Sequence, residues 1–255
     1  MTQYFALVVL AFCCELLDSA LGGGYGTIIV PILLLAGYPR AEAVAAILFS
    51  ETLTGFLAAR EHHRLGNAEF RPTTLETRAA VIIGVLAALG SVVSVVCALE
   101  IDKRLLNGYI GLLIVGIGIY LIVKHFRRVG EAGHVQTWKL AALGFWAGAN
   151  KGVSGGGFGP LVTGALAAAG LTRRAMAITS LAEGITSLAG LVTTALCVGL
   201  GGFNWSLTLV LSFGALCSVT LAAYIVQRLP LDVLRPLVGL AVIALGLALV
   251  VKVLK

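Results

Sequence analysis

The chain has 255 residues, of which 59% are hydrophobic and only 12% are charged, and its formal net charge is +6. Soluble domains carry about a quarter charged residues, so this composition excludes an ordinary water-soluble domain. Apolar runs such as 79–99 and 105–123 reach or approach the ~20 residues that a helix needs to cross a membrane. The alternating pattern of a transmembrane barrel does not appear. We therefore predict an all-α polytopic membrane protein.

The N-terminal stretch, 1–17, is apolar but has neither a basic start nor a small-residue cleavage site. This favours a retained helix over a signal peptide. The apolar run 4–17 is too short to span, and so is the run 27–36 that follows the polar residues Asp18 and Ser19 and a group of glycines. The pattern indicates a broken helix, either two half-helices in line or a hairpin that enters and leaves on one side.

The rest of the chain is predicted to contain six full spans, a polar connector, a basic loop and a second broken helix. The spans are expected at 41–59, 79–99, 105–123, 176–198, 205–227 and 233–252. The connector is 60–77, the basic loop is 124–139, and the second broken helix is 140–169.

A repeated glycine motif organises this series of elements. Residues 21–26 (LGGGYG) return as residues 154–159 (SGGGFG), 133 positions later. The match continues downstream, for example from Arg40 to Arg173, and later from Gly111 to Gly239 at an offset of 128. Such self-similarity indicates a duplicated unit. We expect a first repeat at 1–128 and a second at 129–255, each with a broken Gly-rich helix pair and three spans.

The distribution of basic residues favours the hairpin form of the broken helices. With hairpins, twelve Lys and Arg residues of the loops gather on one side and five on the other, whereas crossing segments give ten against seven. The larger asymmetry agrees better with the excess of positive charge in cytoplasmic loops. It predicts inverted repeats in the cell membrane, with loops 60–78 and 124–139 in the cytoplasm and both termini outside.

Inverted repeats with discontinuous helices place the substrate sites of many secondary transporters near the bilayer midplane. Glycines let the chain turn and direct backbone N–H groups inward. The half-helices that begin near Thr27 and Pro160 would point their positive ends at a common cavity, which makes an anion site. The substrate-binding residues predicted from this arrangement are Ser19, Gly22, Gly23, Gly24, Tyr25, Asn150, Lys151, Ser154, Gly155, Gly156, Gly157 and Phe158.

Lys151 is the sharpest single residue, because it lies eleven residues past Leu140 inside the second broken helix. A lysine at membrane depth is costly and usually serves a function. Two interpretations stay open: contact with an anionic substrate, or a structural salt bridge to Asp18 of the other repeat.

Carboxylates also lie inside predicted spans. Glu183 shares one helical face with Ser180 and Ser187, and Glu51 occupies the equivalent place in the first repeat. Each is either a proton carrier or a hydrogen-bonding group between helices. Asp18 is a further, weaker proton-coupling candidate, as is Glu15.

Other kinds of site find little support. The four histidines, at 62, 63, 125 and 134, fall in predicted loops, so no Ser–His dyad is available in the membrane. The segment Glu61-His62-His63 with Glu69 is expected to be a solvated loop rather than a metal site. No Walker sequence follows the glycines, and the five cysteines are interpreted as free thiols in apolar runs. We predict no cofactor, no metal and no nucleic-acid partner.

Three segments resemble the signatures of the TauE/SafE sulfite exporter family, and the likeness in length and duplication extends along nearly the whole chain. They are 18–26 (DSALGGGYG) with Pro31, 148–160 (GANKGVSGGGFGP) and 178–184 (ITSLAEG). The resemblance implies an inner-membrane carrier of sulfite, of sulfonates such as sulfoacetate, or of related organosulfur acids.

We therefore predict a proton-coupled secondary transporter of a small sulfur-containing anion, and not an enzyme. Its partners would be the anion and the lipid bilayer, and a homodimer is left open. Two alternatives stand beside it. One is a passive anion channel with the same Gly-loop site, and the other is a structural or assembly protein without a permeant.

Overall fold

The structure is a computed structural model that describes residues 2–126, 137–169, 171–225 and 231–254. Within these ranges all regular secondary structure is helical and no strand occurs. The helices are α1 (Thr2–Leu21), α2 (Tyr25–Leu35), α3 (Arg40–Arg64), α4 (Leu75–Glu100), α5 (Lys103–Phe126), α6 (Thr137–Ser154), α7 (Phe158–Ala168), α8 (Thr172–Val198), a 3₁₀ turn (Leu200–Gly202), α9 (Trp205–Ile225) and α10 (Leu231–Leu254).

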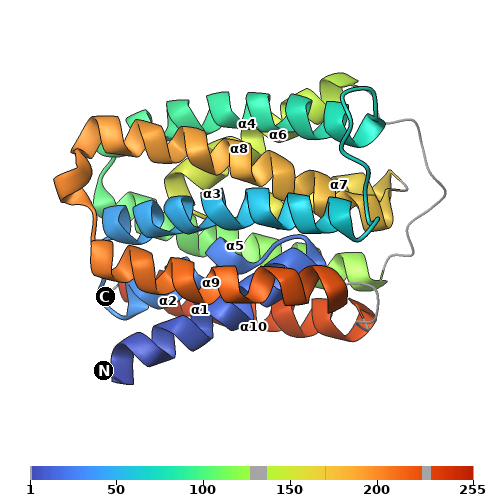
Figure 1. The fold of residues 1–255 in the computed structure, drawn as a ribbon. Coiled ribbons are helices and arrows are strands. Elements are labelled where there is room, and N and C mark those ends of the chain that lie inside the picture. Colours follow the sequence, from blue (N-terminus) through green and yellow to red (C-terminus); the bar gives the residue numbers. More distant parts are fainter. Residues whose placement is uncertain (1, 127–136, 170, 226–230, 255) are drawn as a thin grey trace.

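The long helices run roughly side by side in one bundle (Figure 1). By length and composition, six of the described segments could cross a membrane: Gln3–Leu21, Arg40–Arg64, Leu75–Glu100, Lys103–Val123, Arg174–Val198 and Trp205–Tyr224. Large apolar side chains such as Leu112 and Leu196 are exposed on the outside of the bundle, as expected where lipid replaces water as the solvent. The chain is a multi-pass membrane protein.

The first glycine motif lies between α1 and α2, and these two helices form a hairpin. Gln3, at the start of α1, donates a hydrogen bond of 3.0 Å to the hydroxyl of Tyr38, which follows α2. The start of α1 and the end of α2 therefore lie at the same end of the bundle. Figure 1 shows both chain termini at this end.

The second glycine motif lies between α6 and α7. These two helices form a hairpin that enters the bundle from the end opposite to the first hairpin. Helix α6 runs parallel to α4, as its contacts show: Gly144 packs on Ile83, and Gly148, one turn later, packs on Ala87. Helix α8, which follows α7 after three residues, begins beside the start of α4, where Arg174 and Glu76 form a salt bridge of 3.0 Å. The chain thus leaves α7 at the end of the bundle where α6 began.

Glycines bring corresponding helices of the two halves into close contact. In the α5–α10 pair, Gly111 packs against Gly246 and Gly118 packs against Gly239. In the sequence, Gly111 corresponds to Gly239 and Gly118 corresponds to Gly246, each at an offset of 128. Each glycine therefore packs on the counterpart of the other glycine of its own helix. Small residues let membrane helices approach closely enough for dispersion contacts to hold them together. Helices α3 and α8 also approach closely through small residues, where Gly55 packs on Gly184.

Several predicted boundaries were wrong, because polar residues continue helices that were expected to end. Helix α1 has 20 residues instead of the expected 14, so the expectation that this segment is too short to span was wrong. The helix runs through Asp18 and Ser19, and the Ser19 hydroxyl donates to Glu15 one turn earlier, which satisfies it inside the helix. Helix α3 extends to Arg64, which reduces the connector from 60–77 to 65–74. The repeat boundary at 128/129 lies outside the described residues.

All five cysteines are free thiols, as predicted, but only Cys14 is buried in the packed interior. The other four lie on the outer surfaces of their helices. They therefore contribute little to the core.

Because the glycine backbones are in close contact, replacing one of these glycines by a larger residue should lower the stability of the fold. A Cβ added at Gly26, in α2, would overlap the carbonyl oxygen of Gly155 in the other hairpin. Overpacking of this kind costs about 1–3 kcal/mol, so Gly26→Ala should lower the melting temperature of the purified protein in detergent. Gly116→Ala is the matched control, because Gly116 is also helical and a Cβ there meets nothing within 4 Å. Equal stability of the two variants would contradict this packing.

Candidate functional site

The tips of the two hairpins meet inside the bundle with their backbones in direct contact. Gly23 packs on Gly159 and Pro160, and Gly26 packs on Gly155. Positive φ angles at Gly22 (77°), Gly155 (70°) and Gly157 (83°) make the turns possible. Both tips are buried, because every residue from Leu21 to Val30 and from Ser154 to Pro160 is buried. The structure therefore brings together the two motifs that lie 133 residues apart.

Hydrogen bonds between the hairpins join the two tips. The backbone N–H of Gly157 donates to the hydroxyl of Thr27 at 3.0 Å, and the hydroxyl of Thr163 donates to the carbonyl of Gly22 at 2.6 Å. Thr27 and Thr163 are almost fully buried. Thr27 was expected only as the start of a helix, and Thr163 was not predicted. A threonine within an otherwise apolar half-helix was the available signal.

The positive end of α2 already has an anionic partner. One carboxylate oxygen of Asp18 accepts a hydrogen bond of 2.9 Å from the backbone N–H of Tyr25, the first residue of α2. The backbone carbonyl of Asp18 also accepts from Gly22 at 2.7 Å and Gly23 at 3.0 Å. Asp18 thus caps the half-helix, the arrangement that the helix dipole favours. A substrate anion at α2 would have to compete with this carboxylate.

Lys151 is fully buried and forms two salt bridges inside the bundle. Its Nζ donates to Glu51 Oε2 of α3 and, at 2.7 Å, to Glu183 Oε1 of α8. The ammonium also lies 5.7 Å from the centre of the Phe158 ring, within the range of a cation–π contact. Of the two interpretations of Lys151, the salt bridge to Asp18 is therefore wrong, because the charge partners of Lys151 are Glu51 and Glu183. The helices of these two glutamates, α3 and α8, pack against each other.

The centre of the bundle contains more acidic than basic groups. Four carboxylic side chains, Glu15, Asp18, Glu51 and Glu183, are each at most 8% exposed, and Lys151 is the one buried lysine or arginine among the described residues. Glu15 accepts from Ser19 at 2.7 Å through one oxygen. Its other oxygen is buried and has no hydrogen-bond partner within the described chain. Isolated buried carboxylates are costly when ionised, so this set favours states in which some of them hold protons.

Three further predicted site residues, Tyr25, Asn150 and Ser154, form hydrogen bonds of their own. The Tyr25 hydroxyl lies 2.9 Å from the Ser50 hydroxyl, one residue before Glu51. The side chain of Asn150 accepts a hydrogen bond from the Tyr109 hydroxyl of α5. The Ser154 hydroxyl folds back on its own turn and bonds to the carbonyls of Asn150 (2.8 Å) and Gly156 (3.0 Å).

Little space separates the hairpin tips in this conformation. The pocket lined by Gly22, Gly23, Pro160 and Thr163 has a volume of about 20 Å³. A site needs about 10–15 Å³ to hold even one water molecule, so this pocket is too small for a sulfonate. An anion could reach the glycines only if the two tips separated.

The histidine segment also differs from expectation. His62 and His63 belong to the last turn of α3 rather than to a loop, and His62 is fully buried. The Asn67 amide nitrogen lies 3.0 Å from Nδ1 of His62, and the Phe70 N–H donates to Nδ1 of His63 at 3.2 Å. No group of three metal-binding side chains occurs within the described ranges. His125 is in the helical part of α5, and His134 lies outside the described residues.

Comparisons with known proteins identify the family. The protein family described as "Sulfite exporter TauE/SafE" matches residues 7–249 of this chain. The chain belongs to this family. It is also 26% identical over 246 residues to the probable membrane transporter protein YtnM of Bacillus subtilis (strain 168), a match that covers 91% of this chain and 79% of that protein. No solved structure matches it significantly. The chain is thus a membrane transporter of the TauE/SafE family and not an enzyme.

The buried salt bridges predict strong coupling among three side chains. Lys151→Met would leave two buried carboxylates without their counter-charge, and breaking a buried pair costs about 3–5 kcal/mol. Thermal unfolding in detergent should show this loss. Adding Glu51→Gln and Glu183→Gln to the same variant should recover much of the stability, because no unpaired charge then remains.

Lys139→Met is the control, because Lys139 is exposed and contacts the Trp138 ring instead of a carboxylate. If Lys151→Met were as stable as Lys139→Met, the salt bridges would not stabilise the fold.

Proposed function

We propose that this protein is a proton-coupled secondary transporter of small sulfur-containing anions, such as sulfite or a sulfonate like sulfoacetate. The observation that carries the proposal is the buried Lys151, held between Glu51 and Glu183. A buried ammonium is the natural counter-charge for a substrate anion, and buried ionisable groups in membrane helices commonly mark a transport path. The sulfur chemistry rests on the description of the family.

Charge balance supports the coupling to protons. Lys151 already has two carboxylate partners, so an anion that binds it must displace at least one of them. The displaced glutamate would lie in a nonpolar interior without a counter-charge, which is unfavourable unless it takes up a proton. Anion binding and protonation of Glu183 or Glu51 would therefore occur together. Asp18 and Glu15, which are buried close by, are further acceptors for a proton.

The two hairpins support an inverted-repeat arrangement, with repeats 1–128 and 129–255. The first pair of helices begins and ends at one end of the bundle, and the second pair begins and ends at the other. Contacts between the halves also occur in corresponding pairs: α1 packs on α9 as α6 packs on α4, and α3 packs on α9 as α8 packs on α4. A carrier that exposes its centre alternately to either side commonly uses this symmetry.

The passive channel has less support than the carrier. The glycine tips pack directly on each other, and the space between them is about 20 Å³. An open pore would need a continuous polar lumen at this level. A structural or assembly role would not explain a lysine buried with two glutamates, which is a costly arrangement for stability alone.

The proposal can be tested with purified protein in proteoliposomes. Wild-type protein should take up labelled sulfoacetate or sulfite with saturation, and a pH gradient should drive the uptake. Lys151→Met should reduce anion uptake at least tenfold, because the substrate loses its counter-charge. Its fold has to be checked in parallel by thermal unfolding.

Glu183→Gln separates coupling from binding. A glutamine keeps the size and some of the hydrogen bonds of the glutamate but carries no proton, so uptake driven by a pH gradient should disappear while exchange of internal for external anion persists. Glu69→Gln is the matched control, since Glu69 is exposed and pairs only with Arg71 at the surface. Unchanged gradient-driven uptake by Glu183→Gln would remove this residue from the coupling path.

The predicted orientation has its own test. If loops 60–78 and 124–139 are cytoplasmic and both termini are outside, a cysteine at position 69 should react with an impermeant thiol reagent only in inside-out vesicles. A cysteine at position 201, in the short turn before α9, should react only in right-side-out vesicles. The five native cysteines are first replaced by alanine. The opposite labelling pattern would reverse the orientation.

A further inference from the structure

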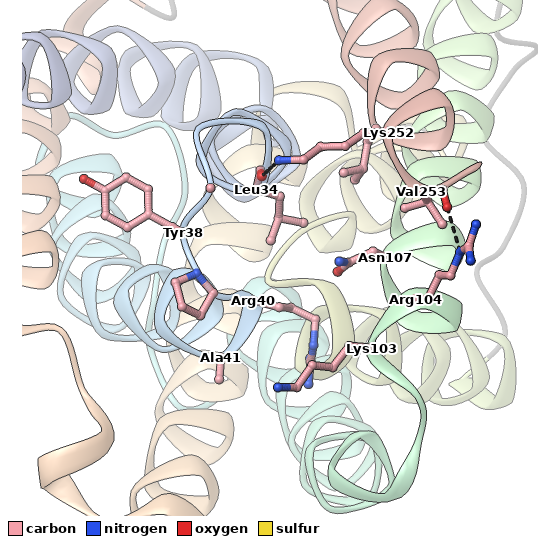
Figure 2. Close-up of a pocket in the computed structure, with 12 residues that line it drawn as sticks. Leu34, Tyr38, Arg40, Ala41, Lys103, Arg104, Asn107, Lys252 and Val253 are labelled. Carbon is pink, nitrogen blue, oxygen red and sulfur yellow. Dashed lines mark hydrogen bonds between the residues drawn. The ribbon is translucent and has the colours of Figure 1, made fainter. Parts of the chain in front are cut away.

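A large cavity lies at the end of the bundle where α2 ends, α3 and α5 begin, and α10 ends. Its volume is about 600 Å³, which is within the range of about 300–1,000 Å³ for small-molecule sites. It is thus far larger than the space between the glycine tips. Figure 2 shows the side chains that surround it, with Lys252 at the top, Arg40 and Lys103 below, and Asn107 between them.

The cavity is lined by four basic side chains and by no acidic one: Arg40, Lys103, Arg104 and Lys252. None of the four forms a salt bridge with any other described residue. The carboxylate closest in sequence, Asp102, does not line the cavity; it caps α5 by accepting from the backbone N–H groups of Arg104 and Leu105. The positive charge of the cavity is therefore not neutralised by any described carboxylate.

The hydrogen bonds of these cations go to backbone carbonyls. Lys252 donates to the carbonyls of Leu34 (2.8 Å) and Leu35 (3.2 Å) at the end of α2, and Arg104 donates to Val253 at 2.8 Å. Figure 2 shows Arg104 turned toward that carbonyl and away from the centre. Carbonyl partners orient a cation without cancelling its charge. Arg40, Lys103 and Lys252 remain able to attract an anion.

The amide of Asn107 adds a neutral polar group to the lining of the cavity. Its side-chain oxygen is buried but has no hydrogen-bond partner in the described part of the chain. In Figure 2 this amide lies between Lys252 above and Arg40 and Lys103 below. Because the two ends of an amide can exchange places, the group can present N–H donors to an anion.

The cavity at the opposite end of the bundle has a different character. It is of similar size, about 670 Å³, but Glu69 and Glu76 line it together with Arg174. Arg174 is already paired with Glu76 at 3.0 Å. An uncompensated positive charge in a cavity of this size thus distinguishes the Arg40 end.

Arg40 also connects the cavity with the central lysine. Its guanidinium donates to the carbonyl of Val153 at 2.9 Å, and Val153 is two residues past Lys151 in the last turn of α6. The same side chain therefore lines the cavity and contacts the tip of the second hairpin. An anion that binds Arg40 lies against the segment that holds Lys151.

We propose that this cavity is an anion-binding vestibule, in which a small soluble oxyanion with a sulfonate or sulfite group binds to Arg40, Lys103 and Lys252 before it reaches Lys151. The inference rests on the proposed function and names a separate first binding site for the same substrate. Its chemical basis is electrostatic: cavities lined by one sign of charge concentrate the opposite ion. The vestibule sets the affinity for the incoming anion, and the central cluster sets the coupling.

The test is a double variant, Lys103→Gln with Lys252→Gln, assayed for uptake of sulfoacetate in proteoliposomes. Removing one charge at about 6 Å from the anion in a wet cavity should weaken binding about threefold. The double variant should therefore raise the KM about tenfold at low ionic strength, with the maximal rate nearly unchanged. The effect should shrink as salt is added, because salt screens exposed charges.

Two variants keep this experiment interpretable. Lys103→Gln alone should raise the KM about threefold, and Lys103 makes no described hydrogen bond whose loss could disturb folding. Lys139→Gln removes an exposed lysine outside the cavity and should leave the KM unchanged. A double variant with the wild-type KM and the wild-type melting temperature would overturn the proposal.

A second measurement does not depend on transport. Sulfate or sulfoacetate, added to detergent-solubilised protein at constant ionic strength against chloride, should raise the melting temperature, and the double variant should show a smaller rise. If wild-type protein transported no anion but showed this difference, the proposed function would fail while the vestibule remained. Saturable uptake with no difference in KM or in thermal shift would remove the vestibule alone.

An anionic lipid headgroup is the competing occupant, because its phosphate has the same chemistry. Proteoliposomes of phosphatidylcholine alone, compared with mixtures that contain phosphatidylglycerol, separate the two. A KM effect that persists in phosphatidylcholine supports the soluble anion. An effect present only with phosphatidylglycerol would assign the cavity to lipid and overturn the proposal.

Discussion

One ammonium group shared by two carboxylates determines how the centre of this protein is assembled. Lys151 comes from α6, Glu51 from α3 and Glu183 from α8, so the three helices must meet at one point. Away from water, any of these groups left alone would cost several kcal/mol. The salt bridges therefore specify which helices are neighbours, because the apolar surfaces of membrane helices do little to distinguish one neighbour from another.

Glycines make this assembly geometrically possible. The hairpin tips approach until the backbone of one touches the backbone of the other, which side chains would prevent. Because polar backbone cannot face lipid, each tip has to be satisfied by the opposite tip or by its own side chains. Thr27, Thr163 and Asp18 provide these bonds. The result is a closed centre in which the half-helix ends are already occupied by the protein's own groups.

The closed centre and the basic cavity have complementary chemistry. Among the described residues, the centre contains four buried carboxylic groups and a single buried lysine, so another negative charge is unfavourable there. Three uncompensated cations at one end of the bundle attract anions from solution. In the proposed mechanism, the basic cavity attracts the anion and the central cluster admits it together with a proton. Arg40 contacts both regions and is the physical connection between them.

The helical membrane class, the repeated glycine motif and the candidates Lys151, Glu51 and Glu183 could be predicted before the fold was known. Each of these follows from local properties, namely composition, periodicity and the cost of charge within an apolar run. The folded chain was needed to show that Lys151 pairs with Glu51 and Glu183 instead of Asp18. It was also needed to show that Arg40, Lys103 and Lys252 line one cavity. These partners are separated by 100 and 32 residues for the two salt bridges. Side-chain partners at such separations depend on which helix faces pack together, and the pattern of one chain does not encode that packing locally.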